Sequence, residues 1–128
     1  MTDDERIEQA ARNELQAGLS RLETEGFLNG RIAVSHLDQL ATTTIEVSGR
    51  FAFTDREVSA CVEIDPGRKG WRIEAELYEY LDADEMQHLV RTLGTSRVTS
   101  AEDAEAGARS LARAAWTSLR EYLRTSGR

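Results

Sequence analysis

Apolar side chains in the first part of the chain lie three or four residues apart, which is the spacing of one face of a helix. The positions that share this face are Ile7, Ala11, Leu15, Leu19 and Leu22. Thr2 or Asp3 suits the N-cap of such a helix, and Gly26 suits a left-handed C-cap. The pattern therefore predicts a helix over residues 4–25.

Beyond Asn29 and Gly30 the period changes to two, which is typical of half-buried strands. Ile32 and Val34 predict a short strand, residues 35–40 an irregular connector, and three longer alternating runs follow. Their apolar sides are Thr43, Ile45, Val47, Phe51 and Phe53, then Val58, Ala60, Val62 and Ile64, then Trp71, Ile73, Ala75 and Leu77. Gly49 interrupts the first run and indicates a bulge or a helix crossing close to the backbone.

Turns between these runs are expected at residues 54–57 and at Asp65-Pro66-Gly67, because proline and glycine favour turn geometry. The runs then form an antiparallel meander of three or four strands. Each strand presents its apolar side to the same face of the sheet, and this face needs a helical cover.

Two helices are predicted after the sheet. Asp82 suits the N-cap of the first, which ends before Gly94. Its buried stripe would be Met86, Leu89, Val90 and Leu93. Ser100 and Asp103 resemble a capping box at the start of the second, which is expected over residues 101–125. The side of this helix that faces the core would hold Ala104, Ala108, Leu111, Ala115, Leu119 and Tyr122.

Residues 1–128 contain no repeat and no linker, so we expect a single two-layer α+β domain. It would consist of an N-terminal helix, a three- to four-stranded antiparallel meander with one face covered by helices, and two C-terminal helices. In its order of elements this arrangement resembles acidic secretion-chaperone-like domains, although no motif is shared.

Composition narrows the class of protein. The 23 acidic and 16 basic residues give a net charge of −7, which disfavours unassisted binding to nucleic acid or to anionic lipid. A disulfide scaffold is excluded because Cys61 is the single cysteine. No apolar run approaches the length of a membrane helix and the N-terminus is acidic, so we expect a cytoplasmic protein. All bases but Lys69 are arginine, a bias that we attribute to a GC-rich bacterial genome.

Residues for catalysis or for metal binding are sparse. Cys61 falls in the middle of a predicted strand, and the two histidines, His36 and His88, lack the spacing of zinc ligands. Arg68 and Lys69 lie in a turn that opens no helix, so we interpret it as a charged hairpin and not as a phosphate loop. We expect no catalytic residue, metal or cofactor. The alternative is a small-molecule pocket or small enzyme between sheet and helices that uses His36, Asp38 or Cys61.

The open face of the predicted sheet is the leading candidate surface for a partner protein, possessing both charges and exposed aromatic side chains. Its residues are Glu46, Glu63, Glu74, Glu76, Tyr78, Tyr80 and Arg72. We interpret the chain as a non-catalytic adaptor, chaperone-like factor, immunity protein or inhibitor whose partner carries a basic surface. The alternative is an ordinary solvated sheet face, which is polar in any case.

The last predicted helix carries a second candidate surface. Four arginines and one tryptophan follow one side of it: Arg109, Arg113, Trp116, Arg120 and Arg124. Such a stripe could contact nucleic acid, or it could pair with the acidic first helix inside the fold. Homodimer formation through an exposed sheet edge or through the alanine-rich helix also stays open.

Overall fold

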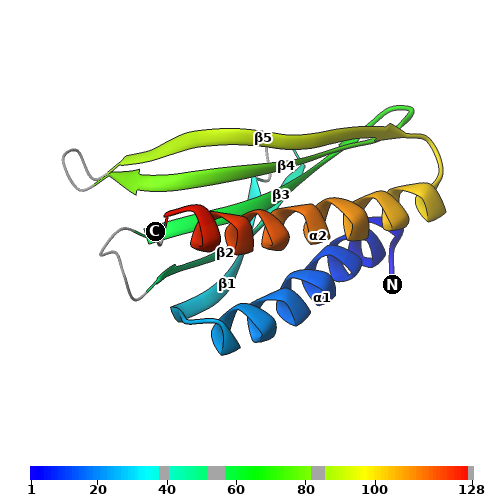
Figure 1. The fold of residues 1–128 in the computed structure, drawn as a ribbon. Coiled ribbons are helices and arrows are strands. Elements are labelled where there is room, and N and C mark those ends of the chain that lie inside the picture. Colours follow the sequence, from blue (N-terminus) through cyan, green and yellow to red (C-terminus); the bar gives the residue numbers. More distant parts are fainter. Residues whose placement is uncertain (38–40, 52–56, 82–85, 127–128) are drawn as a thin grey trace.

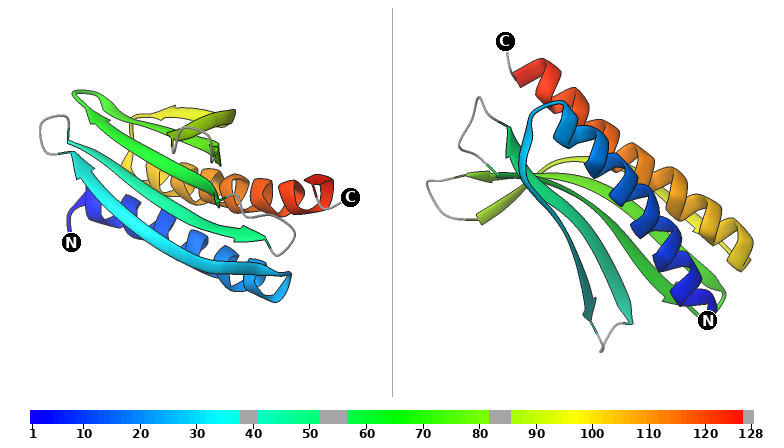
Figure 2. Two further views of the ribbon diagram at one scale, coloured as in Figure 1. Left: turned by 90° about the vertical axis from the view of Figure 1, so that its left-hand side faces the viewer. Right: turned by 90° about the horizontal axis from the view of Figure 1, so that it is seen from below.

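The computed structural model describes residues 1–37, 41–51, 57–81 and 86–126, which form a sheet and a pair of helices packed on one side of it (Figures 1 and 2). The elements in chain order are α1 (Asp3–Thr24), β1 (Phe27–Leu37), β2 (Thr42–Phe51), β3 (Glu57–Gly67), β4 (Gly70–Leu81), β5 (Met86–Val98) and α2 (Ala101–Ser126). Neighbouring strands are antiparallel in the order β1-β2-β3-β4-β5. The predicted two-layer α+β meander is confirmed, with five strands in the sheet and one C-terminal helix where two were predicted.

The predicted first helix is confirmed to within one residue at each end. Thr2 is its N-cap, because the Thr2 hydroxyl accepts a hydrogen bond of 3.2 Å from the Glu5 backbone N–H. The chain leaves the helix through Gly26, whose φ of 101° lies in the left-handed region that favours glycine. The apolar face is buried, as the pattern predicted, at Ile7, Ala11, Leu15 and Leu22.

The first strand is longer than predicted, because residues 35–37, expected in a connector, continue β1. Residues 38–40, which include Asp38, lie outside the described residues. A bulge at Asn29 and Gly30 shifts the pairing of β1 with β2 and lies opposite Gly49. A Cβ at Gly49 would lie 2.6 Å from the Phe27 ring. The space beside this glycine is therefore filled by the Phe27 side chain of β1 and not by a crossing helix.

The apolar sides of the three central runs are confirmed. They form the sheet's half of the core, together with Phe27. The buried positions are Ile45, Val47, Phe51, Val58, Ala60, Val62, Ile64, Ile73, Ala75 and Leu77. Trp71 is partly buried against this core, and Phe53, together with the expected turn residues 54–56, lies outside the described residues.

The turn after β3 falls later than predicted. Gly67 pairs with Gly70, so Arg68 and Lys69 form the turn, and the φ of 135° at Gly70 requires a glycine there. Asp65 and Pro66 belong to the β3–β4 ladder. Pro66 is tolerated in the strand because the paired residues of β2 and β3 end at Ile64, so the missing N–H removes no ladder bond on that side.

The predicted helix over residues 82–93 is wrong: residues 86–98 form strand β5, which pairs with β4 from Leu81–Met86 to Trp71–Val98. Leu89 and Val90, expected to be buried, are 52% and 48% exposed, and Leu93 packs against the core. Gly94 ends no helix. A Cβ there would lie 3.0 Å from the Leu111 side chain, so Gly94 lets α2 approach β5.

The physical reason for this error is non-local. Without β5, the outer edge of β4 would present a long row of unpaired backbone N–H and C=O groups, and pairing satisfies them along the whole strand. Over a segment this short, a helical spacing of apolar residues is a weak local preference that such pairing overrides. The proposed N-cap, Asp82, and the side chain of Met86 lie outside what the structure describes.

The last helix is confirmed and covers the sheet. The Ser100 hydroxyl accepts a hydrogen bond of 3.1 Å from the Asp103 backbone N–H, as an N-cap does. The buried side of α2 is rich in alanine, which brings the helix axis close to the strands: Ala104, Ala108, Ala112, Ala115, Trp116 and Leu119 are buried. Neither of the two described helices is long and apolar enough to cross a membrane.

Candidate functional site

The face of the sheet opposite the helices carries the residues predicted to bind a partner. Because side chains alternate along a strand, the strand register places them in rows across this face. One row holds Thr44, Glu63, Glu74 and Thr95, the next holds Glu46, Cys61, Glu76 and Thr92, and a third holds Ser48, Ser59, Tyr78 and Leu89. The four predicted glutamates therefore lie in two adjacent rows, although they come from three strands.

Cys61 marks the centre of this acidic cluster. This residue is only 5% exposed and lies between Glu46 on β2 and Glu76 on β4. Burial, and after it the charges of Glu76, Glu46 and Glu63, together raise the pKa of the Cys61 thiol from 9.0 to about 12. The thiol is therefore protonated at neutral pH and is a poor nucleophile.

Glu63 and Glu74 lie directly opposite each other on β3 and β4, an unfavourable like-charge pair. Arg72 bridges them, with nitrogen–oxygen distances of 3.7 Å to Glu63 and 2.5 Å to Glu74. Burial, followed by the charge and hydrogen bond of Asp65, raises the pKa of Glu63, and Arg72 counteracts this rise. Arg72 thus offsets only part of the repulsion within the cluster.

Two tyrosines extend the face away from the glutamates. Tyr78 and Tyr80 are half-buried on β4, and Tyr78 lies opposite the exposed Leu89 of β5. Burial, and then the charge of Glu76, raises the pKa of Tyr78 to about 12, so its hydroxyl is a neutral donor over the physiological range. The open face therefore combines an acidic centre with an aromatic and apolar end.

The arginine stripe of α2 faces α1 over part of its length. Arg113 lies 3.0 Å from the Glu14 carboxylate, and Arg120 binds Glu25 through both Nε and Nη2 at 3.0 and 2.5 Å. Trp116 is only 6% exposed and donates a hydrogen bond of 3.1 Å to Glu14. These three members of the stripe are thus engaged inside the fold. The two remaining members are exposed: Arg109 and Arg124.

The residues proposed for an alternative pocket lie on opposite faces of the sheet. His36 on β1 points to the helix layer, where its Nε2 lies 2.7 Å from Glu8 of α1. Cys61 lies on the open face among the glutamates. One pocket cannot be lined by both side chains. Within the described ranges, no group of three or more His, Cys, Asp or Glu side chains is placed to hold a metal ion.

Several residues of this face escaped the sequence analysis. Asp65 had been placed in a turn, Leu89 and Thr92 in a helix, and Thr95 and Arg97 between two helices, so none was assigned to a sheet. Two shifts of register in the β4–β5 ladder disturb the alternation of inward and outward side chains along β5, so this strand lacks a clear sequence pattern.

Comparisons with protein-family models, with curated proteins and with solved structures give no match to this chain.

Proposed function

We propose that this domain acts without catalysis by binding a basic segment of a partner protein on its open sheet face, as an adaptor, chaperone-like factor, immunity protein or inhibitor does. The observation that carries the proposal is the gathering of Glu46, Glu63, Glu74 and Glu76 in two adjacent rows on the face that the helices leave uncovered. A cationic segment is the complement of such a surface.

The electrostatics of the face argue against a plain solvated surface. A sheet exposed to water needs polar residues there, but it does not need glutamates opposite each other, which destabilise the pairing of β3 with β4. The pKa of Glu63 is raised, first by burial and then by the neighbouring carboxylates of Asp65 and Glu76, so its ionised form is disfavoured on this face. Surfaces that sacrifice stability in this way are typical of binding sites, where the missing counter-charges arrive with the partner.

The geometry of the face suits an extended segment. Glu74 and Glu76 are two residues apart on one strand, so their side chains emerge about 6.6 Å apart. An extended peptide with Lys or Arg at every second position has the same spacing. Tyr78 and Leu89 beside the acidic rows would bury apolar area of the partner, which adds affinity to the charge-driven encounter.

Charge reversal at Glu76 tests the proposal. The wild type, Glu76→Lys and Glu23→Lys would be immobilised and used to capture proteins from an extract of the source organism, with identification by mass spectrometry. Glu23 lies on the exposed side of α1, so its variant matches the change of charge away from the sheet. The affinity of each captured protein is then measured with purified components at several salt concentrations.

We expect a partner that binds the wild type and Glu23→Lys but binds Glu76→Lys about tenfold more weakly or worse, with an affinity that falls as salt increases. Unchanged thermal unfolding of Glu76→Lys would show that the variant is folded. Equal affinities for all three proteins would remove the sheet face as the binding surface.

A further inference from the structure

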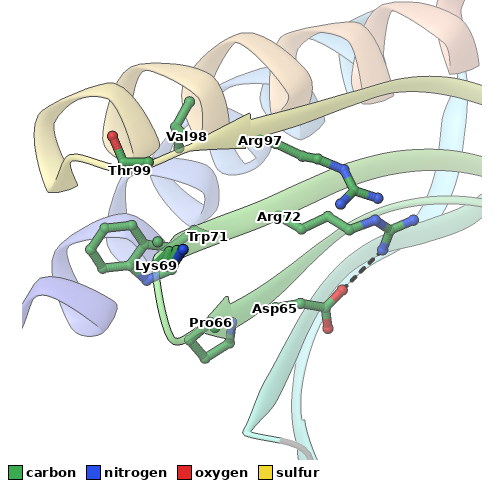
Figure 3. A pocket seen from close by; sticks show the side chains of 10 residues that line it. Asp65, Pro66, Lys69, Trp71, Arg72, Arg97, Val98 and Thr99 are labelled. Atoms are coloured by element: carbon green, nitrogen blue, oxygen red, sulfur yellow. Dashed lines mark hydrogen bonds and ion pairs between the residues drawn. The ribbon is translucent and has the colours of Figure 1, made fainter.

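A groove of about 430 Å³ lies at the end of the sheet beside the β3–β4 turn (Figure 3). Three cationic side chains line it: Lys69 from the turn, Arg72 from β4 and Arg97 from β5. Trp71 and Val98 also border it, but their side chains lie on the helix side of the sheet, where the Trp71 indole donates a hydrogen bond of 2.8 Å to Asp4 of α1.

Arg72 and Arg97 lie directly opposite each other in the β4–β5 ladder, and their side chains extend side by side (Figure 3). Like charges in this position destabilise a sheet unless a counter-charge joins them. Arg72 has counter-charges, because it pairs with Asp65 at 3.1 Å and with Glu74 at 2.5 Å. Neither Arg97 nor Lys69 has a hydrogen bond or an ion pair with any of the residues that the structure describes.

Asp65, the carboxylate in the wall of the groove, does not neutralise Arg97. One of its oxygens accepts a hydrogen bond of 2.6 Å from the Thr42 hydroxyl, and the other binds Arg72. Asp65, Glu74 and Glu63 thus all pair with Arg72, and Arg97 is left without a counter-charge of its own among the described residues.

We propose that this groove is an oxyanion site, which takes a carboxylate or a phosphate group at Arg97, next to Arg72. The guanidinium fork of arginine matches both groups, and a bound anion supplies the counter-charge that Arg97 lacks. The sequence alone favoured a plain charged turn at residues 65–70. It did so because this turn opens no helix, and it did not bring Arg97 to the turn, since residues 86–98 were not assigned to a strand.

Titration with inorganic phosphate, and separately with acetate, tests this site by NMR of the ¹⁵N-labelled protein, with ionic strength held constant by sodium chloride. We expect saturable shift changes at the Arg97 side-chain N–H and at the amides of Gly67, Gly70 and Thr99. Arg97→Gln should weaken binding about tenfold or more, because it removes a charged hydrogen-bond donor. Arg109→Gln, which removes an exposed arginine from α2, serves as the control and should bind as the wild type does.

Saturation by both anions supports a site for carboxylates and phosphates, and saturation by phosphate alone supports a site for a dianion. Equal shifts with sodium chloride alone, or wild-type affinity in Arg97→Gln, would overturn the proposal. The spectrum of each variant shows directly that it is folded. No partner protein takes part in the titration, so its outcome is independent of the protein-binding function proposed above.

Discussion

Gly18 lies in the middle of α1 where Trp116 of α2 packs against it, and the substitution Gly18→Ala tests this contact. A Cβ at residue 18 would lie 2.1 Å from Cγ of the Trp116 ring, closer than any two such atoms can approach. The ring has little room to yield. It is buried, it donates a hydrogen bond to Glu14, and the Arg21 guanidinium lies over it at 5.8 Å from the ring centroid.

The size of the effect follows from three contributions. Alanine favours a helix over glycine by about 1 kcal/mol. Overpacking a closed site costs about 1–3 kcal/mol. Displacing the ring also breaks its hydrogen bond to the charged Glu14, which is worth about 1.5–3 kcal/mol. We therefore expect Gly18→Ala to lower the free energy of unfolding by about 3 kcal/mol, taking the middle of these ranges.

Gly107→Ala on α2 is the matched control. A Cβ there meets the Ser96 hydroxyl at 3.4 Å and the Ile73 side chain at 3.8 Å, which are ordinary contacts. Only the gain in helix propensity remains, so this variant should be about 0.5–1 kcal/mol more stable than the wild type. Urea unfolding followed by circular dichroism measures both variants, and the two effects should have opposite signs.

Trp116→Ala makes the test specific to the ring, because it removes Cγ, Cδ1 and Cδ2, the three atoms nearest to a Cβ at residue 18. In this background Gly18→Ala should cost clearly less than in the wild type, because the atoms that the new methyl group meets have been removed. The same loss in both backgrounds, or a gain in stability from Gly18→Ala alone, would refute the reasoning.

Three further predictions concern the sheet face. Between pH 9 and about pH 12 the Cys61 thiol ionises in the unfolded chain but not in the folded one, so the free energy of unfolding falls as pH rises. Urea titrations at several pH values should show a smaller fall for Cys61→Ala than for the wild type. An equal dependence of the unfolding free energy on pH in both proteins would contradict this reasoning. Because the pKa of Glu63 is raised in the folded state, its ionised form is disfavoured there. Glu63→Gln should therefore increase stability at pH 7, and this gain should fade as acid protonates Glu63 in the wild type; loss of stability at pH 7 would contradict the reasoning. The Ser48 hydroxyl is buried with no hydrogen-bond partner among the described residues. Ser48→Ala should therefore raise the free energy of unfolding by about 1 kcal/mol. A lower urea midpoint for the variant than for the wild type would show that the hydroxyl is hydrogen-bonded.

The elements that the sequence predicted correctly are those whose signal is local. The helical spacing from Ile7 to Leu22 continues over many turns, and the alternation in β2, β3 and β4 continues over whole strands. A long run of one period places all its apolar side chains on the same face of the element, and this face is buried in the core. The acidic face was predictable for the same reason, since the side opposite an apolar strand pattern carries the glutamates.

The strand β5 was not predictable in this way. Its bulges disturb the alternation, and the spacing of Leu89, Val90 and Leu93 matches a helix as well as it matches a strand. Pairing with β4 decides between the two, because it gives this segment a ladder of backbone hydrogen bonds along its whole length. The groove at Arg97 depends on this decision, and so it lay beyond sequence reasoning too.

By itself the sequence determined the period of each long element, and with it the apolar core and the acidic character of the opposite sheet face. It also determined the charge surplus of −7, but not which charges meet. Only the tertiary structure decided that Arg113 meets Glu14 on α1 and that Arg120 meets Glu25 at the C-cap of α1, whereas the sheet glutamates face outward. The physical reason is range: periodicity acts between neighbours in the chain, but these ion pairs join residues 99 and 95 positions apart, which only the packing of α1 on α2 brings together.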